Sequence, residues 1–337
     1  MMINKFYYLF TILYPCASAI GPNTSSNLYP THNVFQFDKI GKWLENIAVR
    51  PNGDLLTTLL YPTASLYTLK RPHSTTREFS LIHTFKNASG LLGITETSVD
   101  NFAILSTQLT DTLGPVPGSS AIWGVSFRHG NFSTRKIASI PDVLVPNGIT
   151  SLPGSSVVLV ADSIGGAVTR CDTLSGVCEL VLNTTETAPV PGSSQRSGIN
   201  GIHYQDGYVY WSNSGLVSLF RTPFDKQGYP VANAGIETVG KVNTSFVDDF
   251  TKDNTGRFWI ATGSNNTIVT LRSDGSTEVA AGSLTELTVA GCTAAAFGRT
   301  VQDNRTLYVV TNGALLAPVN GTTEPAKIVA IDTSRHV

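Results

Sequence analysis

Short apolar strand patterns, separated by turns that contain glycine or asparagine, recur along most of this chain. Each copy has a short strand, a turn and then a more apolar strand. The copies cover residues 43–57, 92–104, 146–162, 199–213, 247–262 and 295–311. Period-two alternation that breaks at turn residues predicts paired antiparallel strands rather than helices. We therefore expect six hairpin-like units.

One apolar position in each first strand allows the six copies to be aligned. The aligned residues are Ile47, Ile94, Ile149, Ile202, Phe250 and Phe297, at intervals of 47, 55, 53, 48 and 47 residues. A repeat of roughly 40–50 residues is typical of a propeller blade, whereas a β-helix repeats over a much shorter interval. The sequence therefore predicts an all-β fold, a six-bladed β-propeller with four-stranded antiparallel blades around a central channel.

Further apolar runs predict strands outside each pair. They lie at residues 64–69, 121–127, 167–171, 217–222, 267–271 and 327–331. A stretch at residues 33–37 is expected to pair with the last blade and close the ring. Without closure, the first and last blades would leave long open edges.

The first nineteen residues differ from the rest. Lys5 precedes the apolar residues 6–14, and the small residues 16–19 follow, which is the order of a secretory signal. We expect residues 1–19 to be a signal peptide cleaved after Ala19, and residues 20–337 to form a single propeller domain. A retained anchor is the alternative, but the apolar stretch is shorter than the roughly 20 residues that span a bilayer. We expect no stable membrane anchor, and a protein secreted or retained in a lumenal compartment.

Composition and charge exclude several classes of protein. The 337 residues include 23 basic and 24 acidic side chains, only 14% of residues are charged, and 41% are hydrophobic. Such a chain has enough apolar surface to fold, and it lacks the basic patch of a nucleic-acid-binding protein. No serine-hydrolase, zinc-protease or nucleotide-binding motif is present. We therefore expect no nucleic-acid partner and no organic cofactor.

Cysteines and glycosylation sequons fit an oxidising compartment. Loss of the signal would remove Cys16, and a disulfide between Cys171 and Cys178 is expected across the turn at 172–177, with Cys292 free. The alternative is three buried thiols. Asn-x-Ser/Thr sequons predict glycosylation in exposed loops. They occur at Asn23, Asn87, Asn131, Asn183, Asn243, Asn265, Asn304 and Asn320.

Polar residues are expected at the propeller axis. The positions two residues before each anchor are Glu45, Leu92, Asn147, Asn200, Asp248 and Ala295. Two carboxylates and two amides among them are the hard oxygen ligands that Ca²⁺ or Mg²⁺ prefers. We therefore predict a cation site at Glu45, Asn147, Asn200 and Asp248. The alternative is that these side chains hydrogen-bond to one another and to ordered water in the channel.

The sequence segments around these four residues are similar to those of known proteins. The chain resembles the gluconolactonase, regucalcin (SMP-30) and squid-type diisopropylfluorophosphatase group of six-bladed propellers. The matching segments are Leu-Glu-Asn-Ile at Glu45, Pro-Asn-Gly-Ile at Asn147, Ile-Asn-Gly-Ile at Asn200 and Val-Asp-Asp-Phe at Asp248. The resemblance implies calcium at these four residues. Asn-Ile follows Glu45 where the group has Gly-Pro, and Leu92 replaces a polar contact, so the resemblance does not extend to sugar-lactone chemistry.

A more specific likeness lies in the segments 43–50, 90–94, 198–202, 248–250 and 296–300. They resemble a fungal secreted branch of these propellers, whose characterised members are hetero-Diels–Alderases of tropolone sesquiterpenoid biosynthesis. There a hydroxymethyl tropolone loses water to give a quinone methide, which a humulene-type alkene traps. The resemblance implies a pericyclase with hydrophobic small-molecule substrates. The alternatives are a divalent-cation-dependent lactonase or phosphotriesterase-like hydrolase, and a non-catalytic ligand-binding propeller.

A cycloaddition needs two apolar partners held in one orientation. Glu45 and Asp248 are the candidate catalytic groups, acting on the tropolone oxygens directly or through a metal. His203 is a candidate proton shuttle, although strict strand alternation places it opposite to Asn200 and favours a structural histidine. Candidate substrate contacts are Trp43, Asn46, Trp211, Asn213, Asp249, Phe250 and Phe297. For the aromatic residues the alternative is packing between blades.

Overall fold

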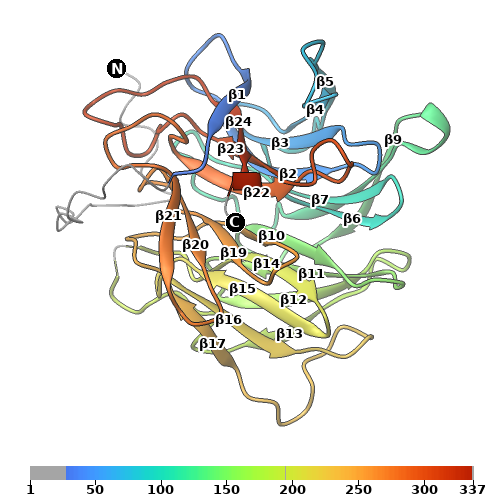
Figure 1. Ribbon diagram of the computed structural model, residues 1–337. Helices are drawn as coiled ribbons and strands as arrows, with labels where there is room; N and C mark the ends of the chain where they lie inside the picture. Colours follow the sequence, from blue (N-terminus) through green and yellow to red (C-terminus); the bar gives the residue numbers. More distant parts are fainter. Residues whose placement is uncertain (1–27, 194, 336–337) are drawn as a thin grey trace.

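The alternating patterns fold into antiparallel sheets in a computed structural model, which describes residues 28–193 and 195–335. Six four-stranded sheets follow one another along the chain (Figure 1). This confirms the predicted all-β, six-bladed propeller with antiparallel blades. Short 3₁₀ turns lie at Arg128–Gly130 and Thr333–Arg335. No helix of the described residues is long and apolar enough to cross a bilayer.

The strands of the blades are as follows. Blade one has β2 (Trp43–Val49), β3 (Leu55–Tyr61), β4 (Ser65–Lys70) and β5 (Glu78–Thr84). Blade two has β6 (Gly90–Ser98), β7 (Asn101–Thr107), β8 (Ala121–Ser126) and β9 (Ser133–Ser139). Blade three has β10 (Pro146–Ser151), β11 (Val157–Asp162), β12 (Ala167–Asp172) and β13 (Cys178–Asn183).

The remaining blades repeat this order. Blade four has β14 (Ile199–Gln205), β15 (Tyr208–Asn213), β16 (Ser218–Pro223) and β17 (Glu237–Lys241). Blade five has β18 (Phe250–Lys252), β19 (Phe258–Ala261), β20 (Thr267–Leu271) and β21 (Thr277–Gly282). Blade six has β22 (Cys292–Phe297), β23 (Thr306–Thr311), β24 (Lys327–Asp332) and, from the other end of the chain, β1 (Thr31–Gln36).

The N-terminal strand closes the ring. β1 pairs antiparallel with β24, with Thr31 opposite Ile331 and Gln36 opposite Lys327, and the two strands lie side by side in Figure 1. The inner strand β22 of blade six also contacts β2 of blade one. The predicted closure by residues 33–37 is therefore confirmed, and β24 is not left as an open edge.

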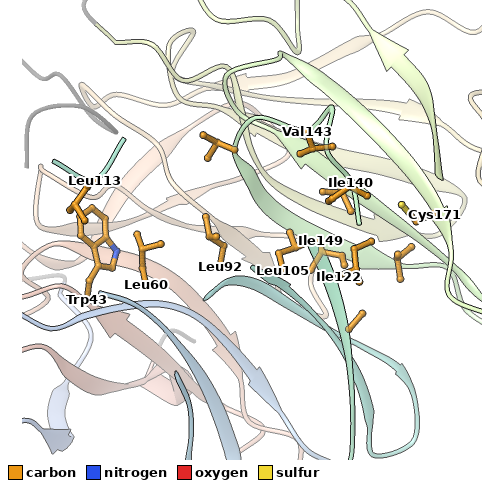
Figure 2. Packing of buried hydrophobic residues seen from close by; sticks show 14 of the residues in the cluster. Trp43, Leu60, Leu92, Leu105, Leu113, Ile122, Ile140, Val143, Ile149 and Cys171 are labelled. Carbon is orange, nitrogen blue, oxygen red and sulfur yellow. The ribbon is translucent and has the colours of Figure 1, made fainter. Parts of the chain in front are cut away.

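Apolar side chains fill the space between blades. Figure 2 shows Trp43 and Leu60 of blade one on one side of Leu92, and Leu105 and Ile149 of the next two blades on the other. All five belong to one cluster and are buried. Burying each such side chain contributes roughly 1.5–3 kcal/mol. Leu92, predicted at the axis, is thus also part of the core between blades.

The predicted disulfide is present, joining Cys171 of β12 to Cys178 of β13, and Cys292 is a free, buried thiol. Six of the predicted glycosylation sites are exposed: Asn87, Asn131, Asn183, Asn243, Asn304 and Asn320. Asn265 is only 6% exposed, and its Oδ1 accepts a hydrogen bond from the Ser245 hydroxyl. The Asn265 side chain is therefore not accessible for glycosylation. The predicted signal peptide, with Cys16, and the sequon at Asn23 lie outside the described residues.

Candidate functional site

β-Bulges in the inner strands determine which side chains lie near the propeller axis. In β2 the register shifts between Leu44 and Asn46, so Glu45 is the extra residue. Corresponding shifts occur early in β6, β10, β14 and β22. A bulge lets two consecutive residues oppose one on the partner strand and re-aims their side chains. Each of these five blades therefore contributes two successive residues near the axis. In blade five, whose β18 has no bulge, the corresponding residues Asp248 and Asp249 directly precede the strand.

These residues form two layers, which we define here. The first layer consists of Glu45, Leu92, Asn147, Asn200, Asp248 and Thr293, and all six are buried. The second layer consists of Asn46, Gly93, Gly148, Gly201, Asp249 and Ala294. Five of the six predicted axial residues are in the first layer. Ala295 was wrong for blade six. The bulge residue of β22 is Thr293, so Ala295 corresponds to Ile47 and Phe297 lies two residues too late.

Hydrogen bonds hold the polar members of the first layer. The Trp43 indole Nε1 donates to Glu45 Oε2 at 2.5 Å. The Asn200 amide donates to Ser214 Oγ at 3.1 Å, and its side chain also reaches the carboxyl of Asp248. Asn200 Oδ1 is buried without a hydrogen-bond partner. The layer therefore retains an unused acceptor beside a carboxyl group.

Burial controls the acidity of this layer. Desolvation raises the pKa of Glu45 to about 8, the charge of Asp249 adds to the effect, and the Trp43 hydrogen bond opposes it. Desolvation also raises the pKa of Asp248 well above its ordinary value, with further increases from Glu45 and Asp249. Among the described residues no Lys or Arg forms an ion pair with Glu45 or Asp248. Two poorly compensated carboxyl groups therefore lie at the axis.

Four first-layer residues have carboxylate or amide oxygens of the kind that bind a hard cation. The described part of the chain contains no group of three or more His, Cys, Asp or Glu side chains arranged for a metal. The predicted set instead combines Glu45 and Asp248 with the amides of Asn147 and Asn200. The unpartnered oxygen of Asn200 is a ligand of the kind that Ca²⁺ accepts. These four residues are the ones that could hold a cation.

The second layer contains a polar bridge. Asn46 Nδ2 donates to Asp249 Oδ2 at 2.9 Å, and His203 Nε2 lies 2.9 Å from Asp249 Oδ1. The side chain of His203 is 41% exposed, against 10% for Asp249. Strict alternation predicted that His203 points away from Asn200. That was wrong, because the bulge in β14 lets both residues reach aspartates of blade five.

A small cavity of about 20 Å³ opens beside the first layer. It is lined by Trp43, Phe246, Asp248, Gly263, Ser264, Gly291, Asn312, Ala314, Leu316 and Ala317. This space is enough for about one water molecule. Of the predicted site residues, only Trp43 and Asp248 line it. Sequence reasoning missed the others because they lie mainly in loops, where no periodic pattern indicates orientation.

Two predicted substrate contacts in blade four have structural roles. Trp211 is fully buried, stacks on Phe220 with ring centroids 5.9 Å apart, and donates from Nε1 to the Glu186 carbonyl. Asn213 donates to the Glu186 and Ala188 carbonyls and accepts from two backbone amides of the following turn. Neither residue lines the cavity, so the prediction is not supported for them.

The other two predicted aromatic contacts pack between neighbouring blades. Phe250 is buried, and its ring meets the His203 ring edge-on at 4.7 Å. Phe297 is half-buried and packs edge-on against Trp259 at 5.8 Å. The packing between blades that was the alternative for these residues is what the structure has.

Comparison with solved structures supports the fold. The chain superimposes on a luciferin-regenerating enzyme with a TM-score of 0.62 at 11% identity, covering 89% of this chain and 95% of that one. For the calcium-binding protein regucalcin of Agrobacterium tumefaciens the TM-score is 0.58 at 14% identity, covering 91% and 96%. At these identities the likeness concerns the fold alone. No protein-family profile matches the chain.

Sequence comparison gives nearer relatives. Asr5 of Sarocladium schorii, named a putative hetero-Diels-Alderase, is 30% identical over 307 residues, which cover 80% of this chain and 75% of the relative. A protein of the same description from a Phoma species is 29% identical, covering 92% of this chain and 94% of the relative. The chain therefore belongs to the family of these two proteins, both named putative hetero-Diels-Alderases, and has a six-bladed propeller fold of the SMP-30 and regucalcin type.

Proposed function

We propose that this protein is a hetero-Diels–Alderase that joins a tropolone quinone methide to a humulene-type alkene at the propeller axis. The observation that carries the proposal is the buried Asp248 carboxyl, which faces a cavity lined largely by apolar side chains such as Trp43, Phe246 and Leu316. The relatives named for this activity support the choice of reaction. The substrates are hydrophobic small molecules.

The proposed reaction requires little acid–base catalysis by the protein. In the cycloaddition one C–C and one C–O bond form together, and no proton is transferred. Holding the two partners in one orientation lowers the barrier by several kcal/mol, up to roughly 7–11 kcal/mol in the most favourable intramolecular reactions. A hydrogen bond from Asp248 to the oxygen of the heterodiene stabilises the charge that develops there.

The same site serves the step that makes the diene. The quinone methide forms when the C–O bond of the hydroxymethyl group breaks and its hydroxyl leaves as water with the proton of the tropolone hydroxyl, while the methylene carbon stays on the ring. A hydrogen bond to the departing oxygen assists this loss. Trp43 lies against the cavity and is held in place by Glu45. Glu45 therefore acts on the substrate through the orientation of Trp43, and Asp248 contacts it directly.

The size of the cavity limits how the substrate binds. Pockets for small molecules usually have roughly 300–1,000 Å³, whereas this cavity has about 20 Å³. We therefore place only the oxygen-bearing edge of the tropolone inside. The carbon skeletons of both partners then lie over the mouth, against the side chains of Leu316 and Ala317.

We also propose that Glu45, Asn147, Asn200 and Asp248 bind Ca²⁺ or Mg²⁺. The unpartnered oxygen of Asn200 supports this. A bound cation would keep Asp248 ionised, so its Lewis acidity would then take the place of the Asp248 hydrogen bond at the substrate oxygen. The same observation favours a second candidate function, a cation-dependent hydrolase of lactones or phosphotriesters.

The test is incubation of the protein with a quinone-methide precursor and a humulene-type alkene, with and without EDTA, against a no-protein control. We expect the adduct to form faster with protein. Loss of the acceleration with EDTA would support the cation, and unchanged acceleration would overturn that part. No acceleration would contradict the cycloaddition. Turnover of a lactone and phosphotriester panel with calcium would then favour the hydrolase.

Substitution of Asp248 tests its assigned role. We expect Asp248→Leu to lower kcat/KM by about 10²-fold, because a preorganised hydrogen bond in a water-poor site is lost. Asp248→Asn keeps an N–H donor and should lose less. Asp142→Leu is the matched control, because Asp142 is exposed on the surface. Equal rates for Asp248→Leu and the control would refute the role.

We further propose that the protein passes through the secretory pathway and is glycosylated. The disulfide and the six exposed sequons support this. Peptide mass mapping before and after N-glycosidase treatment should find glycans at exposed sites such as Asn87 and Asn243. Unmodified peptides at all six exposed sites would contradict the proposal.

A further inference from the structure

We infer that Asn46, Asp249 and His203 form a positioning bridge across the channel that fixes where Asp248 and Glu45 lie. This inference rests on the proposed function, since Asp248 is the group assigned to the substrate. It adds three residues that touch neither the cavity nor the reacting atoms. Their proposed task is to hold the residues that do.

The bridge connects blades that are not all neighbours. Asn46 of blade one donates to Asp249 of blade five at 2.9 Å. His203 of blade four meets the other oxygen of the same carboxylate at 2.9 Å. Blade six lies between blades five and one along the ring. The bond between Asn46 and Asp249 therefore spans the channel instead of following the ring.

Each end of this bond is one peptide unit away from a first-layer acid. Asn46 directly follows Glu45, and Asp249 directly follows Asp248. The inner strand of blade five is also short, with its regular pairing beginning at Phe250. Asp248 therefore lies just outside the three-residue strand, where its amide donates to the Ala261 carbonyl at 2.8 Å. The anchored side chain of Asp249 adds a second restraint on the backbone next to it.

Neighbouring backbone amides and a glycine accommodate the side chains of the bridge. Asn46 Oδ1 accepts from the Ile47 amide at 2.8 Å, and Asp249 Oδ1 also accepts from the Phe250 amide at 2.7 Å. A Cβ atom on Gly201 would lie 2.2 Å from Asp249 Oδ1. Glycine at 201 thus makes room for the carboxylate. Every oxygen of the bridge has a donor. Removing Asn46 leaves the buried Asp249 Oδ2 without one, whereas removing His203 leaves Oδ1 with only the Phe250 amide.

His203 has two possible tasks that a single pair of variants separates. As a proton shuttle it would need a titrating ring, whereas as a positioning residue it needs only a donor toward Asp249. Gln supplies a donor without a titrating ring, and Ala supplies neither. Rescue of function by His203→Gln therefore indicates positioning.

A measurement without substrate tests the bridge independently of the proposed reaction. The chain has four Trp residues, and the ¹⁵N-indole resonance of Trp43, assigned by its loss in Trp43→Phe, reports its bond to Glu45. We expect Asn46→Leu and His203→Ala to shift this resonance. His203→Gln should leave it in place, and the indole of Trp123, bonded to Ser106, is the internal control. An unmoved Trp43 resonance in both disrupting variants would overturn the inference.

Kinetics with the proposed substrates complete the test. We expect Asn46→Leu and His203→Ala to lower kcat about 10-fold with little change in KM, because the apolar substrate contacts remain. His203→Gln should stay within about 3-fold of wild type. If His203→Gln is as slow as His203→Ala, His203 acts chemically and the positioning role is wrong. Absence of all cycloaddition would defeat the proposed function, while the indole shifts would still decide the bridge.

Discussion

At the scale of single residues, Asp162 shows how one carboxylate organises a loop between blades. It ends β11, is buried, and accepts hydrogen bonds from the backbone amides of Leu144, Val145 and Gly165 at 2.8–3.0 Å. Asp162→Ala should lower the free energy of unfolding by about 1–3 kcal/mol, because buried donors lose their acceptor. Denaturant titration measures this. A change below the experimental error would contradict the assigned role.

The same scale shows what the repeat interval can predict. Glu45, Asn147, Asn200 and Asp248 were placed at the axis from spacing alone, and they lie in the first layer. Thr293 was missed because the aligned apolar position of blade six was taken as Phe297, whereas Ala295, two residues earlier, is the residue that corresponds to Ile47. Aromatic residues such as Trp211 were predicted as substrate contacts and are buried in the core, because the apolar pattern marks burial and does not distinguish a pocket from a core.

At the scale of elements, the hairpin of β12 and β13 is held by its disulfide. Cys171 and Cys178 are directly opposite in the sheet and seven residues apart. Replacing both by serine should lower the free energy of unfolding by about 2–3 kcal/mol, because the unfolded chain regains the freedom of that loop. Denaturant titration tests this. Reductant should destabilise wild type but not the double variant, and equal sensitivity would contradict the expectation.

Strand prediction succeeded where strands are buried. The six predicted third strands, such as residues 267–271, are found within one or two residues of their expected ends. Of the outermost strands, only β1 was predicted, and those of the other five blades were not. β5 and β13 are mostly half-buried or exposed, and polar residues there blur the alternation that a buried strand shows.

At the scale of the whole molecule, closure by β1 determines whether the ring is complete. A chain that begins at Phe37 would expose the edge of β24, and we expect it to aggregate or to lose cooperative thermal unfolding. A chain that begins at Ile20 is the control. Size-exclusion chromatography and calorimetry measure the outcome. Wild-type behaviour of the shorter chain would contradict the role of β1.

The architecture could be predicted from the sequence because a repeat fold buries the same pattern in every blade. The motifs of the inner strands indicated the family, since those strands carry the axial residues. The cavity could not be predicted in the same way. Its loop residues, including Phe246 and Leu316, come together only when the ring closes.

The most direct test of the account is the enantiomer ratio of the adduct formed by wild type and by Trp43→Ala at equal conversion. If both partners are oriented beside Trp43 and Asp248, wild type should give predominantly one enantiomer. Trp43→Ala should move the ratio toward that of the no-protein reaction, with its fold verified by circular dichroism. A folded Trp43→Ala variant that keeps the wild-type ratio would show that the reaction occurs elsewhere.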